Sequence, residues 1–209
     1  MKVIIFGATG KIGQHIMSQA LEMGHNASAF TRNPEQISQS HKNLRVIKGD
    51  VLDAKTVLDA VSGQDAVFCT LGMPPMNKAG LRAKGTKNIV TAMEETNVKR
   101  LICLSVYGAG DSWDQLPFSY KYLIMPLLLR HVVKDHNAQE KFITNSNLSW
   151  TIVRPVNFTK GERTGTYLHN FSAPQSKPTF KISQADVADF MTKQLSTDIF
   201  VSKTPSISY

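Results

Sequence analysis

The chain has 209 residues, of which 42% are hydrophobic and 19% charged, and its formal net charge is +8. This composition is ordinary for a soluble globular protein, and we predict one domain over residues 1–209. The basic residues are spread along the chain without a basic–aromatic cluster. We therefore expect an anionic cofactor or a small acidic substrate as the partner, and no nucleic acid.

The two cysteines, Cys69 and Cys103, each lie inside an apolar, strand-like run. Buried thiols of this kind are typical of a reducing compartment. No apolar stretch approaches membrane-spanning length, and no charged leader with a cleavage site flanks the opening apolar run. The sequence therefore predicts a cytoplasmic protein that has no membrane partner.

The first predicted strand, residues 3–6, leads directly into a glycine-rich turn, Gly7-Ala8-Thr9-Gly10-Lys11-Ile12-Gly13. A helical pattern follows as far as Gly24. This order places free backbone N–H groups and the positive end of a helix at one point, which favours phosphate binding. We expect Gly7 to permit the tight turn, Gly10 to admit a pyrophosphate, and Gly13 to allow helix–sheet packing. A turn that binds nothing is the alternative, and a mononucleotide P-loop is disfavoured because Ile12 follows Gly10-Lys11.

The end of the second predicted strand, residues 25–31, carries a base where many dinucleotide sites carry an acid. The residues there are Thr31-Arg32-Asn33. A carboxylate at this place would bind the ribose 2′-hydroxyl of NAD, whereas the guanidinium of Arg32 suits a 2′-phosphate. The pattern predicts NADP(H) in preference to NAD(H), although a solvated turn arginine would look the same.

Further strands are predicted at 44–48, 64–71, 99–105 and 150–153, and they alternate with helical patterns. Asp53 and Ser183 are predicted N-caps, and Asn147 a left-handed helix end. Six strands in this alternation predict an α/β fold: a Rossmann-like, doubly wound parallel sheet with helices on both faces. Ligands bind at the carboxyl edge of such sheets, where the segments starting at Gly7, Arg32, Asp50, Leu71, Ser105 and Pro155 should converge.

Residues 106–118 and 156–178 are predicted to form substrate loops over this edge. Four aromatic residues in them could form a wall for a stacked ring: Tyr107, Trp113, Phe118 and Phe158. Ser105 is the candidate catalytic residue, holding a carboxamide or an acceptor carbonyl, and a serine bonded only to backbone is the alternative. His136 is expected on a helix surface. No cluster has metal-ligand spacing, so no metal is predicted.

Several motifs carry a family resemblance: Gly7–Gly13, Gly49-Asp50-Val51, residues 63–67, and Thr151-Ile152-Val153-Arg154-Pro155. They resemble the atypical short-chain dehydrogenase/reductase family, which includes NmrA-like proteins. Residues 85–93, 134–136 and 207–209 are similar to its branch of biliverdin and flavin reductases. The resemblance implies NADP(H) bound by Gly7, Thr9, Gly10, Lys11, Ile12, Gly13, Arg32, Asp50, Val51, Leu71, Gly72 and Met73, with Ser105, Val106 and Pro155 beside the nicotinamide.

Three positions depart from that branch. Gln36 replaces a second arginine for the 2′-phosphate, which weakens the expected preference for NADPH. Val156 replaces an active-site histidine, which argues against tetrapyrrole reduction. Lys11 replaces an uncharged residue and would add a phosphate contact.

The chain lacks the Tyr-x-x-x-Lys pair typical of the wider superfamily, because Val132 and His136 occupy the aligned positions. Without that proton donor, alcohol–ketone interconversion is improbable. Hydride transfer to a flavin, a quinone or a similar conjugated small molecule needs mainly positioning. A non-catalytic, NADP(H)-sensing NmrA-like regulator is the alternative, and a sugar-nucleotide epimerase is disfavoured by the same missing tyrosine. A monomer or a small homo-oligomer is expected.

Overall fold

A computed structural model describes residues 1–72, 80–124, 127, 129–170 and 178–209. Its centre is an eight-stranded sheet in the order β3-β2-β1-β4-β5-β6-β10-β8, and only β8 runs antiparallel to its neighbour. The strands are β1 (Lys2–Phe6), β2 (Asn26–Thr31), β3 (Leu44–Lys48), β4 (Ala66–Cys69), β5 (Arg100–Leu104), β6 (Ser149–Pro155), β8 (Leu168–His169) and β10 (Ser206–Ser208). The predicted doubly wound α/β fold is confirmed.

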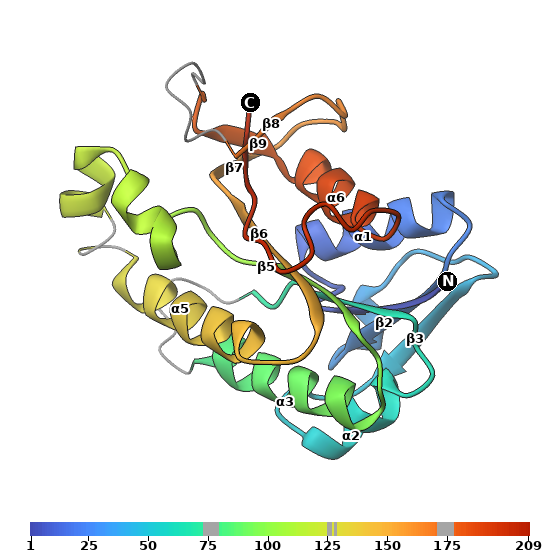
Figure 1. Ribbon diagram of the computed structural model, residues 1–209. Coiled ribbons are helices and arrows are strands. Elements are labelled where there is room, and N and C mark those ends of the chain that lie inside the picture. Colours follow the sequence, from blue (N-terminus) through green and yellow to red (C-terminus); the bar gives the residue numbers. More distant parts are fainter. Residues whose placement is uncertain (73–79, 125–126, 128, 171–177) are drawn as a thin grey trace.

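Helices cover both faces of the sheet. The helices α1 (Lys11–Glu22) and α6 (Gln184–Lys193) lie on one face; α2 (Ala54–Val61), α3 (Leu81–Glu95) and α5 (Arg130–Thr144) lie on the other (Figure 1). Alternate residues of β1 enter the two cores. Val3 and Ile5 belong to the cluster that includes α1 and α6, whereas Ile4 and Phe6 belong to the cluster that includes α2 and α3. An apolar, largely β-branched run is therefore buried on both sides, as expected for a central parallel strand.

Local capping chemistry sets several helix ends. Asp53 accepts from the backbone N–H of Lys55 at 3.0 Å, and Ser183 accepts from that of Asp186 at 3.0 Å, so both predicted N-caps are confirmed. The prediction for Asn147 is wrong, because α5 ends at Thr144 and Asn147 is absent from the described non-glycine residues that have positive φ. The chain leaves α5 through right-handed backbone and needs no left-handed residue there.

The first turn of α3 is capped by a residue from another helix. Gly80, at the N-cap position, has φ +65° and offers no side chain. Asp135 on α5 supplies the cap: its Oδ1 accepts from the backbone N–H of Ala83 at 3.0 Å and its Oδ2 from that of Arg82 at 3.2 Å. These bonds join α3 to α5 at the end of both helices that faces the carboxyl edge of the sheet.

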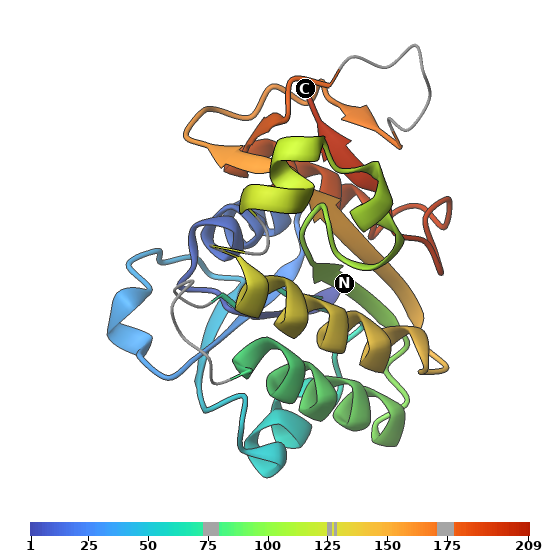
Figure 2. The same ribbon diagram turned by 90° about the vertical axis from the view of Figure 1, so that its left-hand side faces the viewer.

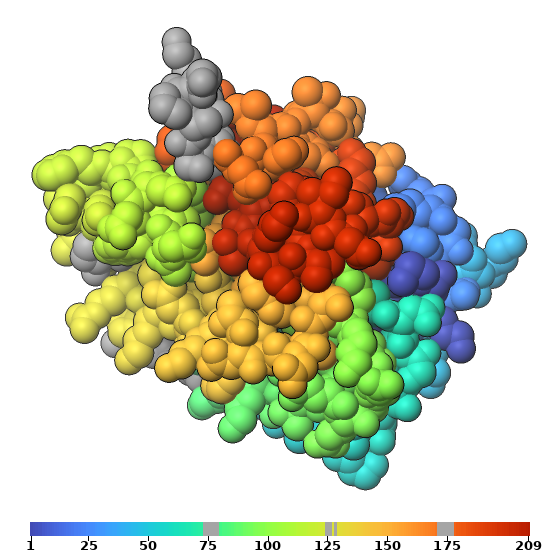
Figure 3. Space-filling model, in the orientation of Figure 1, coloured from blue at the N-terminus to red at the C-terminus, as the bar shows by residue number. Residues whose placement is uncertain are grey.

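The last third of the chain holds more strands than predicted. The strands β7 (Asn157–Thr159) and β9 (Lys181–Ser183) form a second, parallel pair, and β8 and β10 extend the main sheet. The segment 156–178, predicted as a loop, thus contains the short strands β7 and β8, and its residues 171–177 lie outside the described chain. Figure 3 shows the C-terminal part of the chain, in red, next to the N-terminal part, in blue, and α6 packs against α1. No described helix is both long and apolar enough to span a membrane.

Three short helical turns follow strand ends near the carboxyl edge of the sheet. They are η1 (Pro34–Gln36), η2 (Gly110–Gln115) and the π-helical η3 (Tyr120–Ile124). Figure 2 shows η2 and η3, in lime, beside the orange strands that include β7 and β9. The Asn157 amide donates to the Tyr120 hydroxyl at 2.6 Å across this contact. Residues 120–124, just after the segment 106–118 predicted as a substrate loop, therefore contact the start of the segment 156–178 above the ends of β5 and β6.

Candidate functional site

Two cavities lie along the carboxyl edge of the sheet and share Gly10, Leu71 and Gly72 in their walls. The smaller, of about 360 Å³, lies over the ends of β2 and β3. The larger, of about 600 Å³, lies over the ends of β5 and β6 and under β7 and β9. Together they make one groove across the β1–α1 turn, at the point where the strand order reverses, which is where α/β sheets bind their ligands.

The glycine turn at the middle of this groove has no room for larger residues. Gly7 has φ +88°, and a Cβ there would lie 2.4 Å from the carbonyl oxygen of Thr70. A Cβ on Gly13 would lie 2.3 Å from the carbonyl oxygen of Gly7. The first turn of α1 carries no acidic side chain, and its N-cap residue Gly10 makes no side-chain capping bond. The turn thus leaves the positive end of α1 facing the groove, as an anion site requires.

The smaller cavity is lined by one base and one acid from successive strand ends. Arg32 follows β2, Asp50 follows β3, and Gln36 of η1 lies in the same wall. Asp50 Oδ1 accepts from the backbone N–H of Leu52 at 3.0 Å, which fixes that carboxylate at the rim. Among the described residues, no carboxylate forms an ion pair with Arg32. The guanidinium is exposed, so it remains available for an anion bound in this cavity.

Aromatic and aliphatic side chains form the walls of the larger cavity. Tyr107 and Phe158 line it as predicted, but Trp113 and Phe118 do not. Trp113 packs against the core, and Phe118 is 76% exposed and contacts Tyr122 in a tilted arrangement, with ring centroids 4.8 Å apart. Neither side chain lines the cavity, so these two predictions are wrong.

Two aromatic residues of the wall escaped prediction. Phe180 packs edge-on against Tyr107, with ring centroids 5.8 Å apart, and stacks with Tyr120 at 6.3 Å. Phe180 has φ +55° and directly precedes the three-residue strand β9. No apolar pattern in the sequence signals its position in the cavity wall. Tyr120 lies in an aromatic cluster at residues 118–122, which was the only available signal in the sequence.

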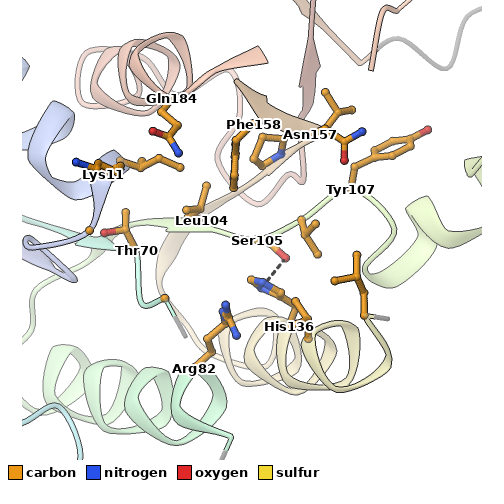
Figure 4. Close-up of a pocket in the computed structure, with 18 of the residues that line it drawn as sticks. Lys11, Thr70, Arg82, Leu104, Ser105, Tyr107, His136, Asn157, Phe158 and Gln184 are labelled. Atoms are coloured by element: carbon orange, nitrogen blue, oxygen red, sulfur yellow. Dashed lines mark hydrogen bonds between the residues drawn. The ribbon is translucent and has the colours of Figure 1, made fainter. Parts of the chain in front are cut away.

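Ser105 lies at the base of this cavity, directly after β5, and is 2% exposed. Its hydroxyl donates to Oε1 of Glu140 at 2.5 Å, and the Nδ1 atom of His136 lies 3.5 Å from Oγ of Ser105. Figure 4 shows His136 and Ser105 facing each other across the lower part of the cavity. The hydroxyl therefore bonds to two side chains of α5 and is not a serine bonded only to backbone.

The prediction that His136 lies on a helix surface is wrong. The side chain is buried, because α5 packs its polar residues Asp135, His136, Gln139 and Glu140 toward the sheet and α3. Burial, reinforced by the positive charge of Arg82, lowers the pKa of His136 from 6.5 to about 3. The imidazole is neutral at physiological pH.

The proton of this neutral imidazole can be placed. Gln139 donates through Nε2 to the Thr86 hydroxyl at 3.0 Å, so its Oε1 is left to accept. Oε1 lies 3.0 Å from Nδ1 of His136, which must therefore be the protonated nitrogen. His136 thus donates into the protein interior through Nδ1, toward Gln139 and the Ser105 oxygen.

Behind Ser105 lies a buried ion pair that sequence reasoning missed. Arg154 of β6 donates to Glu140 through Nε at 3.0 Å and through Nη2 at 2.6 Å. The two side chains are 4% and 8% exposed. Arg154 Nη1 also pairs with Asp111, and this bond, more than their charge attraction, lowers the pKa of the Asp111 carboxyl. Each partner comes from a different element, so nothing local in the sequence signals the cluster.

The structure brings most of the predicted cofactor residues to one groove. The smaller cavity is lined by Gly7, Thr9, Gly10, Arg32, Asp50, Val51, Leu71 and Gly72, and the larger by Lys11, Ile12, Gly13, Ser105, Val106 and Pro155. Val156 and Val132 also line the larger cavity. Met73 lies outside the described residues. Within the described part of the chain, no group of three or more His, Cys, Asp or Glu side chains is arranged to hold a metal ion.

Relatives identified by sequence are longer than this chain. A chloroplast protein of Arabidopsis thaliana with no assigned activity is 31% identical over 78% of this chain and 61% of its own length. The photosystem II assembly factor Ycf39 of Synechocystis is 24% identical over 98% of this chain and 61% of its own length. The chain therefore spans about three-fifths of these relatives.

Solved structures share the fold over the whole chain. The oxidoreductase ylbE of Lactococcus lactis superposes with a TM-score of 0.85 at 23% identity, covering 100% of this chain and 90% of its own. ChuY, an anaerobilin reductase of Escherichia coli, gives 0.82 at 21% identity and covers 100% and 97%. A short-chain dehydrogenase/reductase of Veillonella parvula in complex with NADP gives 0.82 at 19%, covering 100% and 94%.

The sequence profile described as NAD(P)H-binding matches residues 7–198, which include the glycine turn, both cavities and the buried cluster around Ser105. The chain belongs to this NAD(P)H-binding family.

Proposed function

We propose that the protein is an NADPH-dependent reductase that passes hydride to a flavin, a quinone or a similar conjugated acceptor. The observation that carries the proposal is the groove made by two adjoining cavities, in which the glycine turn and the uncapped start of α1 lie between a small cavity lined by Arg32 and Asp50 and a large aromatic one. When bound, NADPH supplies the hydride. The chain's own residues orient both reactants and shield the reacting faces from water.

The groove fits a dinucleotide in one direction. The uncapped start of α1 would bind the pyrophosphate, with Lys11 close to it. Arg32 would bind the 2′-phosphate, and Asp50 would accept from the adenine amino group. The nicotinamide would then lie in the larger cavity beside Ser105, Val106 and Pro155, all of which line it. A preference for NADPH over NADH is part of the proposal and depends on Arg32.

Three polar residues at the base and wall of the larger cavity, Ser105, His136 and Tyr107, have their protons directed elsewhere, which favours a conjugated acceptor over a simple ketone. A ketone needs a proton donor for the developing alkoxide. The proton of Ser105 is donated to Glu140, that of neutral His136 toward Gln139, and the Tyr107 hydroxyl to Gln115. A reduced flavin or quinone spreads its charge over the ring system and takes its proton from water. The aromatic walls suit such a ring.

The proposal is tested with purified protein, NADPH and a panel of FMN, riboflavin and small quinones. We expect loss of the reduced-nicotinamide absorbance with at least one acceptor under anaerobic conditions, and slower loss with NADH. Calorimetry with NADPH alone measures binding independently of turnover. Absence of heat would refute the dinucleotide site, and binding without turnover on the whole panel would refute the reductase assignment.

One observation favours a second candidate, a regulator that senses NADP(H) without catalysis. Ser105, His136 and Tyr107 direct their protons away from a bound acceptor, and the chain lacks the Tyr–Lys pair of catalytic relatives. A regulator would bind NADPH and NADP⁺ with different affinities and leave every acceptor unreduced. The same calorimetric and spectroscopic measurements separate the two candidates.

A further inference from the structure

The direction of the Ser105 hydroxyl proton is fixed by the residues beneath it. Glu140 receives two hydrogen bonds from the guanidinium of Arg154, which stays charged at all accessible pH values, so the carboxylate is ionised and can only accept. Its Oε1 lies 2.5 Å from the Ser105 oxygen, which is the distance of a charge-assisted O–H···O⁻ bond. The serine proton therefore points into the protein and away from the cavity.

The serine oxygen keeps its lone pairs for other donors. A hydroxyl has one proton and two acceptor positions. The proton on Nδ1 of His136 is directed mainly at Gln139, at 3.0 Å, and lies at the longer distance of 3.5 Å from the Ser105 oxygen. Ser105 lines the larger cavity, so a lone pair is available to a group bound there. A carbonyl oxygen bound there would face that lone pair and find no proton.

We propose that Ser105 acts only as a hydrogen-bond acceptor in this site: it takes an N–H of the nicotinamide carboxamide, and Glu140 and Arg154 are positioning residues that fix this polarity. The inference rests on the proposed dinucleotide site but not on any acceptor being reduced. It assigns Ser105 to orienting the cofactor ring and removes it from proton donation to the substrate.

The experiment combines a residue change with a matched cofactor change. The 3-acetylpyridine analogue of NADP keeps the ring carbonyl and replaces the amide NH2 by a methyl group, so it has no N–H to donate. Dissociation constants of NADP⁺ and of the analogue are measured by calorimetry for the wild type and for Ser105→Ala. We expect Ser105→Ala to weaken NADP⁺ by about tenfold, because one buried hydrogen bond is lost. The analogue should change by less than about twofold.

An equal loss for both cofactors, or a larger loss for the analogue, would overturn the inference, because each means that Ser105 does not receive the amide N–H. Absence of binding by either cofactor to the wild type would instead refute the dinucleotide site itself. The measurement needs no turnover, so failure to find an acceptor does not affect it.

A second variant tests the positioning residues. In Glu140→Gln the negative charge that holds the Ser105 proton is lost. One Arg154 N–H then faces the amide NH2 in either orientation of the side chain, because Nε bonds to Oε1 and Nη2 to Oε2. The serine proton is no longer held by a charged acceptor and can turn toward the cavity. We expect the ratio of analogue affinity to NADP⁺ affinity to rise at least about fivefold, the worth of one hydrogen bond. Glu94→Gln removes the same charge from an exposed position on α3 and should leave the ratio unchanged.

A merely structural role for Glu140 would weaken both cofactors alike, and that result would overturn this part of the inference. Should Glu140→Gln fail to fold, as judged by its circular dichroism spectrum, the Ser105→Ala cycle decides the polarity of Ser105 without it.

Discussion

Gly13 lies directly against the carbonyl oxygen of Gly7, so that a Cβ built on Gly13 would be 2.3 Å from that oxygen. This contact packs the start of α1 onto the turn that follows β1. Gly13→Ala forces the turn and the helix apart, and we expect it to lower the free energy of unfolding by about 2–3 kcal/mol, in the range for overpacked sites. Urea denaturation in the absence of nucleotide measures this. Gly24→Ala is the control: φ is +79° but the space is open, and about 1 kcal/mol is expected. Equal losses would contradict the packing argument.

Arg32→Ala should weaken NADPH far more than NADH. The charge-assisted bonds of a guanidinium to a phosphate predict a loss of roughly 10- to 100-fold for NADPH, whereas the NADH affinity should change little. Titration calorimetry with both nucleotides provides the measurement. Arg45→Ala removes an arginine from the opposite end of β3 and should affect neither nucleotide, since Arg45 does not line the cavity. Parallel losses for both nucleotides would remove Arg32 from the 2′-phosphate site.

His136 predicts acid sensitivity of the fold. The pKa of His136 is lowered to about 3 in the folded chain, because burial and Arg82 oppose its charge, and it returns to about 6.5 on unfolding. As the pH falls below 6.5, the unfolded chain therefore takes up a proton that the folded chain does not. The free energy of unfolding therefore falls. Between pH 7 and pH 5, the titration of His136 accounts for about 2 kcal/mol of this decrease.

His136→Gln lacks this titration, so its free energy of unfolding should fall by about 2 kcal/mol less than that of the wild type over the same pH interval. Urea denaturation at several pH values gives both curves. The comparison uses slopes, so a constant loss of stability from the substitution does not obscure it. Parallel curves would show that His136 titrates alike in the folded and unfolded chains.

Phe158→Ala should impair acceptor binding while leaving the nucleotide untouched. Phe158 lines the aromatic cavity, and loss of one stacked ring costs about 1 kcal/mol, or about fivefold in the KM of the acceptor. Phe118→Ala serves as the matched control, because Phe118 is 76% exposed and lies outside the cavity wall. Steady-state kinetics with the acceptor found active, together with NADPH calorimetry, separates the two effects. An unchanged KM in Phe158→Ala would place the acceptor elsewhere.

Features that depend on a few neighbouring residues were predictable from the sequence. The strand–glycine turn–helix at the start of the chain, the caps at Asp53 and Ser183, and the parallel alternation each follow from one short pattern. Because parallel strands bring their carboxyl ends to one edge, the convergence of Arg32, Asp50 and Ser105 also followed from the strand assignments alone. The roles of these residues toward a nucleotide stay predictions.

Features that depend on pairing between distant segments were not predictable. Glu140 and His136 are polar residues on a helix, and a helical pattern assigns such residues to the surface. Arg154 and Ser105 satisfy Glu140, and Gln139, itself bonded to Thr86, satisfies His136. Arg154, Ser105 and Thr86 come from other segments of the chain. The strand β10 is only three residues long, and its isoleucine between two serines gives too weak an alternation to identify a strand. It joins the sheet because the edge of β6 that does not face β5 offers backbone groups for pairing.

Because two backbone amides at the start of α3 donate to Asp135, their hydrogen exchange depends on the contact between α3 and α5. In most helices the first amide protons exchange with deuterated solvent as soon as the end frays. Here the amide protons of Arg82 and Ala83 are bonded to a side chain of α5, so they exchange only when Asp135 releases them. Their deuterium uptake thus records how often the contact between the starts of α3 and α5 opens beside the larger cavity.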